Sequence, residues 1–74
     1  REALSEAEPR VLRYLPSNLT APEIADDLIV SANTVRTHMR RIYAKLGAHS
    51  RAAAVARARD LGLLAAPPSR ARVR

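Results

Sequence analysis

Polar side chains that could bond to the edges of nucleic-acid bases recur at helical spacing between residues 33 and 40. One helix face would carry, at i, i+3, i+4 and i+7, the residues Asn33, Arg36, Thr37 and Arg40. An arginine can donate two parallel hydrogen bonds to guanine, while a threonine offers a hydroxyl and a methyl group for thymine. No acidic residue occurs between Asp27 and Asp60. This pattern favours contact with a polyanion over the mixed charges of a purely solvated helix face.

Two predicted helices frame these side chains. The first, over residues 21–28, begins at the capping box formed by Thr20 and Glu23. The second, over residues 32–46, begins at Ser31 as N-cap and ends at Gly47. Apolar residues recur along the second helix at core spacing, namely Val35, Met39, Ile42, Tyr43 and Leu46. The polar face of residues 33–40 therefore lies opposite an apolar stripe.

The spacing of three small or apolar residues is typical of a helix-turn-helix. Ala25 is small enough for two helices to cross closely, Val30 stands in the turn, and Val35 follows on the second helix. A DNA major groove admits a helix presented in this way. The alternative is a helical hairpin within an ordinary bundle, which the same spacing also fits.

Further helices are predicted on either side of this pair. Residues 5–15 begin with a second capping-box pattern, Ser5 and Glu8, and are stopped by Pro16. Asn18 is expected to adopt the left-handed conformation in the turn that follows. Ser50 caps a helix over residues 51–61. The sequence thus predicts an all-α fold, a four-helix bundle containing a helix-turn-helix, as one domain over residues 1–64, followed by a flexible basic tail over residues 65–74.

Length, charge and composition restrict the function classes. The 74 residues contain no Cys, so disulfides and thiolate-ligated metals are excluded. The net charge of +6 is uneven, because every charged residue from Arg36 onward except Asp60 is basic. Such asymmetry indicates a polyanionic partner, although a basic surface without a partner is the plainer alternative. No apolar run approaches the ~20 residues that span a bilayer. The chain opens on Arg1, which indicates a fragment of something longer.

An enzyme is a poor fit to this chain. The two imidazoles, His38 and His49, are not spaced as a ligand pair, so neither a metal nor a cofactor is expected. There is no Gly-rich loop and no nucleophile with a base at suitable spacing. A helical protein-interaction module that docks RNA polymerase or a sigma factor remains the alternative to DNA binding, and it would not require Arg36 or Arg40.

Long stretches of the chain resemble a known family. The segments LSEAEPRVLRYL, LTAPEIADDLIVSANTVRTHMRRIYAKLGAHSRAAAVARA and LGLL look like the LuxR/GerE-type helix-turn-helix domain of bacterial transcription factors. The version at the C-terminus of large MalT-like regulators is particularly similar. The resemblance covers residues 4–64. Arg10, Asn18 and Ala21 depart from residues common in the family, and Ala21 puts in doubt a phosphate contact at its position.

The resemblance implies a role for several residues. The third helix would read the major groove through Arg36, Thr37 and Arg40. Backbone phosphates would be contacted by Thr20, Asn33, Thr34, Arg41 and Lys45. The fourth helix would dimerise through Ala53, Val55, Ala56 and Arg59. The expected protein is a cytoplasmic bacterial regulator that binds an inverted-repeat operator in double-stranded DNA as a homodimer, with RNA polymerase as a possible further partner.

Overall fold

The computed structural model describes residue 4 and residues 7–64, and this part of the chain folds into helices without any strand. The elements are α1 (Glu8–Leu12), α2 (Ala21–Leu28), α3 (Ala32–Leu46) and α4 (Arg51–Asp60). The predicted all-α fold with four helices is therefore confirmed. The predicted basic tail, residues 65–74, lies outside the described residues, and so does Ser5 of the first predicted capping box.

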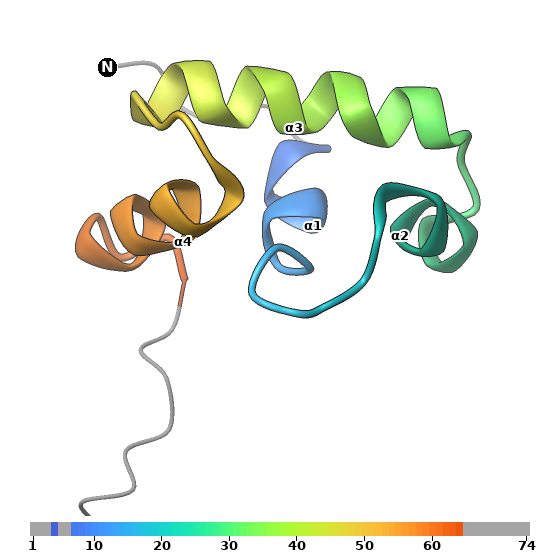
Figure 1. Cartoon of the computed structure of the whole chain (residues 1–74), viewed down its shortest axis with the longest axis horizontal. Helices are drawn as coiled ribbons and strands as arrows, with labels where there is room; N and C mark the ends of the chain where they lie inside the picture. The colour runs from blue at the N-terminus through green and yellow to red at the C-terminus, as the bar shows by residue number, and fades with distance from the viewer. Residues whose placement is uncertain (1–3, 5–6, 65–74) are drawn as a thin grey trace, which may run out of the picture.

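The longest helix, α3, organises the fold. Figure 1 shows α1, α2 and α4 on one side of α3, and each of the three packs against it. The other side of α3 is left uncovered along most of its length. This arrangement divides α3 into a face that builds the core and a face that meets solvent.

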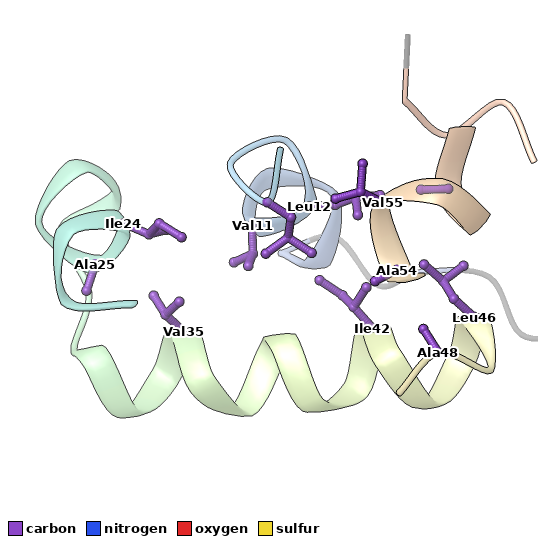
Figure 2. Close-up of a cluster of buried hydrophobic side chains, with 12 residues drawn as sticks. Val11, Leu12, Ile24, Ala25, Val35, Ile42, Leu46, Ala48, Ala54 and Val55 are labelled. Atoms are coloured by element: carbon purple, nitrogen blue, oxygen red, sulfur yellow. The ribbon is translucent and has the colours of Figure 1, made fainter. Parts of the chain in front are cut away.

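The core lies between the inner face of α3 and the other three helices. Val35 and Ile42 are completely buried, and Leu46 is nearly so. In Figure 2 the Val35 side chain points toward Ile24 of α2, while Ile42 points toward Leu12 of α1. The buried residues of α4 are Ala54, Val55 and Ala58. The predicted apolar stripe of the third helix is confirmed, with Met39 and Tyr43 half-buried at its edges.

Three predicted N-caps are present. Thr20 and Glu23 form the full capping box, in which the Thr20 amide donates to Glu23 Oε1 (2.8 Å) and the Glu23 amide donates to Thr20 Oγ1 (3.4 Å). Ser31 Oγ accepts from the Thr34 amide, and Ser50 Oγ accepts from the Ala53 amide, both at 3.1 Å. These bonds satisfy amides that a helix start leaves without an intrahelical partner.

The turn between α2 and α3 corrects one sequence prediction. Within the described residues, the non-glycine residue with a positive φ is Ile29 (φ 58°), not Asn18. Ile29 ends α2, and its amide donates to the Ala25 and Asp26 carbonyls. A β-branched residue pays a steric cost in this conformation. Here the tight connection into α3 imposes the conformation, and the Ile29 side chain extends into solvent at 89% exposure.

The first helix is shorter than the predicted span of 5–15. After Leu12 the amides of Tyr14 and Leu15 donate three residues back, to Val11 and Leu12 respectively, which is a tighter winding than an α-helix. Pro16 then keeps Leu15 from continuing the helix. Residues 13–16 are consequently turns, although Leu15 is still buried in the core.

Candidate nucleic-acid interface

The uncovered face of α3 presents cationic side chains with no partner inside the protein. Arg36, Arg40 and Arg41 are exposed, and the described structure records no hydrogen bond or ion pair from their guanidinium groups. Thr37 lies half-buried between Arg36 and Arg40 along the helix. Side chains in this state can reach an external ligand without breaking an internal contact. The face has the length of two helical turns, which suits a groove rather than a pocket.

The beginnings of α2 and α3 contribute hydroxyl and amide groups. Asn33 is exposed in the first turn of α3, and Thr34 Oγ1 lies 2.8 Å from Ser31 Oγ. Thr20 is exposed at the start of α2, where its hydroxyl also donates to Glu23 Oε1 (3.2 Å). The first amides of each helix have no intrahelical acceptor and attract anions. The Thr20 amide and hydroxyl both donate to the Glu23 carboxylate. The phosphate contacts of Thr20, Asn33 and Thr34 stay predictions.

Lys45 does not belong to this open face. Its Nζ lies 2.9 Å from Oε1 of Glu8, whose side chain is completely buried, while the Lys45 side chain is only 18% exposed. A buried carboxylate requires a nearby opposite charge. Lys45 thus has a structural role that joins α3 to α1, and its predicted phosphate contact stays a prediction. The pairing was not visible in the sequence, because the two residues lie 37 positions apart.

Two arginines of α4 also have internal partners that sequence reasoning missed. Arg51 donates four hydrogen bonds to carbonyls of the segment between α1 and α2. Arg57 Nε donates to the Leu46 carbonyl at the end of α3 (3.1 Å). Backbone carbonyls carry no sequence signature, so no local pattern could have indicated these contacts. Arg51, part of the basic half of the sequence, is thereby committed to the fold.

The predicted dimerisation residues of α4 are not equally accessible. Ala56 is exposed, Ala53 and Arg59 are half-buried, and Val55 is only 8% exposed because it packs into the core. Beside them lies a shallow groove of about 450 Å³, lined by Leu15, Pro16, Ser17, Arg51, Ala52, Val55, Ala56 and Arg59. Val55 therefore supports α4 from inside, while Ala56 and Arg59 reach its outer surface.

The two histidines lie apart from the open face of α3 and from each other. His38 is half-buried beside a small cavity of about 60 Å³, which Leu28 and Val30 also line, and His49 is exposed on a loop. Among the described residues no three His, Cys, Asp or Glu side chains gather closely enough to hold a metal. None of the described helices has the length and apolar character needed to span a bilayer.

Both tyrosines have a raised pKa. Desolvation raises the pKa of Tyr14, and the nearby Asp27 carboxylate raises it further. Desolvation likewise raises the pKa of Tyr43, partly offset by the positive charge of Arg51. Each of these effects favours the neutral phenol.

Comparison with known proteins identifies the family. The family model described as "Bacterial regulatory proteins, luxR family" matches residues 2–58. The chain belongs to the luxR family. The resemblance deduced from the sequence is confirmed, and the family is one of DNA-binding transcription regulators with a helix-turn-helix.

Several luxR-family relatives are similar along most of the chain. Fimbriae Z protein of Escherichia coli is 53% identical over 47 residues, which cover 64% of this chain and 22% of the relative. The probable transcriptional regulatory protein NarL of Mycobacterium tuberculosis is 46% identical over 61 residues, covering 82% of this chain and 28% of the relative. The chain spans about a quarter of the length of these relatives. The narrower resemblance to MalT-like regulators stays a prediction.

A solved structure supports the same assignment for the fold. The crystal structure of response regulator ChrA in a heme-sensing two-component system matches with a TM-score of 0.80 and 41% identity. The match covers 86% of this chain and 32% of the other. The luxR-family fold therefore includes all four described helices, and not the helix-turn-helix alone.

Proposed function

We propose that this domain binds double-stranded DNA sequence-specifically, with α3 in the major groove. The observation that carries the proposal is the division of α3 into a fully packed face and an open face without acids. On the open face Arg36, Thr37 and Arg40 would read base edges. Arginine suits guanine O6 and N7, and the threonine methyl suits the thymine methyl. Membership of the luxR family supports this use of the third helix.

Phosphate contacts would come from the edges of the same surface. They would be made by Thr20 at the start of α2, by Asn33 and Thr34 in the first turn of α3, and by Arg41 on its open face. The start of a helix attracts anions. Such contacts fix the register of the protein on the duplex without specifying sequence. Lys45 is left out of this set because Glu8 holds its ammonium group.

We infer further that the domain acts as a dimer on an inverted repeat in the bacterial cytoplasm. Two copies would pair through α4. Ala53, Ala56 and Arg59 would lie at the contact, and Val55 would support α4 from the core. A single module contacts only one half-site, so pairing on DNA would raise affinity through linked binding. The rival proposal is a module that docks RNA polymerase or a sigma factor through protein contacts alone.

Selection from a randomised duplex pool at two salt concentrations tests this function. An enriched palindrome supports base reading by a dimer, and enrichment of one half-site supports reading by a monomer. Salt-sensitive binding without enrichment would leave only phosphate contacts. No binding at all would favour the protein-docking module. Arg13→Ala serves as the matched control for Arg40→Ala, because Arg13 is exposed but follows α1, away from the open face of α3.

A further inference from the structure

Arg51 makes the densest set of side-chain hydrogen bonds in the described structure. Its Nε donates to the Leu15 carbonyl (2.8 Å), and its Nη1 donates to the Leu19 carbonyl (2.7 Å). Its Nη2 donates to the carbonyls of Tyr14 (3.0 Å) and Ser17 (2.9 Å). A guanidinium offers five N–H donors in a rigid plane. Arg51 uses four of these donors, and all four bonds end on carbonyls of one segment, residues 14–19.

This segment leads directly into α2. Leu19, which accepts the shortest of the four bonds, precedes Thr20, the N-cap of α2. The Leu19 amide donates in turn to Ser17 Oγ (3.2 Å), so the segment is also bonded within itself. Arg51 is the first residue of α4. Its side chain consequently fixes the beginning of α4 to the beginning of α2, two elements far apart in sequence.

We propose that Arg51 is a positioning residue for the DNA interface and acts through Thr20. It holds the start of α2 in the position from which Thr20 would reach a phosphate. It does not touch DNA itself, because its donors are directed at carbonyls and α4 lies on the covered side of α3 (Figure 1). This inference rests on the proposed DNA binding. It adds that α4, besides pairing two copies, sets the position of a phosphate contact.

The chemistry of the site separates Arg51 from an ordinary surface charge. Lysine would keep the positive charge but cannot donate to four carbonyls in one plane. If charge alone mattered, Arg51→Lys would therefore bind DNA like the wild type. If the planar group matters, the same substitution should loosen residues 14–19 and displace Thr20.

A double-mutant cycle on the half-site enriched from the duplex pool tests the proposal. Thr20→Asp keeps a capping side chain but opposes a phosphate, and it is combined with Arg51→Lys. We expect Arg51→Lys alone to weaken DNA binding about threefold to tenfold. The salt slope, which is the slope of the logarithm of the binding constant against the logarithm of the salt concentration, should not change. Because Thr20 is already displaced in the Arg51→Lys variant, Thr20→Asp should cause a smaller loss of DNA affinity in that variant than in the wild type. Arg40→Ala is the matched control. The fold loss in DNA affinity of the Arg40→Ala, Arg51→Lys double variant should equal the product of the two single losses. Circular dichroism checks that each variant is folded at the assay temperature.

Three results would overturn the proposal. If the affinity losses of Thr20→Asp and Arg51→Lys multiply, as expected for Arg40→Ala and Arg51→Lys, then Arg51 has only a general stabilising role. A salt slope reduced by about 0.9 in Arg51→Lys would make Arg51 a phosphate contact instead. Unchanged affinity in Arg51→Lys would mean that the four bonds are irrelevant to binding. If neither Arg40→Ala nor Thr20→Asp alters binding, the proposed function itself fails, which is a distinct outcome.

A measurement on the unmodified chain avoids any risk that the variant unfolds. Coupling is reciprocal, so if the Arg51 bonds favour DNA binding, DNA must favour the Arg51 bonds. Hydrogen exchange of the Arg51 Nε–H, followed by NMR, should become slower when the enriched duplex is bound. An unchanged exchange rate in the complex would contradict the proposal.

Discussion

The ammonium of Lys45 and the carboxylate of Glu8 join the end of α3 to the start of α1, with Nζ 2.9 Å from Oε1. Glu8 is completely buried and stands among apolar core residues. Burying a carboxylate is costly unless a cation accompanies it, so the two residues depend on each other. The pair fixes α3 against the remainder of the core at the end opposite the helix-turn-helix.

Loss of this ion pair should lower the free energy of unfolding but should not change the salt dependence of DNA binding. Lys45→Met removes the cation that faces the buried Glu8 carboxylate and should lower the free energy of unfolding by about 3 kcal/mol in urea titrations. Arg41→Met, on the open face, should change that free energy by no more than about 0.5 kcal/mol. DNA binding should show the opposite pattern. Arg41→Met should reduce the salt slope by about 0.9, whereas the folded Lys45→Met variant should have the salt slope of the wild type. A reduced slope with intact stability in Lys45→Met would restore Lys45 as a phosphate contact.

The residues proposed to read bases should be separable from the proposed phosphate contacts, because only the former affect binding in a sequence-dependent way. Arg36→Ala or Arg40→Ala should weaken binding to the preferred duplex by ~1–3 kcal/mol and remove the preference at one base position. Competition assays with duplexes changed at single positions measure both effects, with Arg13→Ala as the control. An equal loss on every duplex would show that the substituted arginine contacts phosphate.

Ile29 offers a route to a more stable domain. Its left-handed φ of 58° carries a steric cost, and its side chain is 89% exposed, so little buried area is lost on replacement. Ile29→Asn should raise the free energy of unfolding by ~1 kcal/mol, because asparagine tolerates this conformation. Val30→Asn is the matched control, being the next residue and 44% exposed but without a positive φ. It should not stabilise the fold; if Ile29→Asn also fails to do so in urea titrations, the φ carries no cost.

Stability should decline at alkaline pH partly through the tyrosines. Because the folded state raises the pKa of Tyr14 and Tyr43, their contribution is complete below about pH 10, the pKa of an unperturbed tyrosine, and is lost as the pH rises through the folded values. Absorbance of the phenolate reports the two tyrosines directly, since the chain contains no Trp. Both should titrate later in the folded than in the urea-unfolded protein. Asp27→Asn should lower the pKa of Tyr14 and leave that of Tyr43 unchanged; equal shifts would contradict the assignment to Asp27.

Features set by local chemistry could be predicted from the sequence. The caps at Thr20, Ser31 and Ser50 depend on a side chain and an amide three positions away, and all three form as predicted. The bounds of α2 and α3 agree with the predictions for the same reason, and α4 ends one residue earlier than predicted. Gly47 ends α3 in the left-handed conformation, as expected for a glycine at that position.

Features set by tertiary contacts could not be predicted. Periodicity extended the first helix to Leu15, because a buried residue after the helix continues the apolar pattern even when the backbone has left it. Asn18 is the residue type expected in a left-handed turn, but the geometry of the α2–α3 connection places that conformation at Ile29. Arg51 and Lys45 read as surface charges because their acceptors lie more than 30 positions away.

The uncovered face of α3 has a consequence for how such domains diversify. Arg36 and Arg40 have no partner in the described fold, so exchanging them for other side chains disturbs neither the core nor a cap. If these two arginines read base edges as proposed, single substitutions there would change the operator preference and leave folding and stability almost unchanged. A lineage of regulators would then acquire different target genes at little structural risk, and an engineer would retarget this scaffold in the same way.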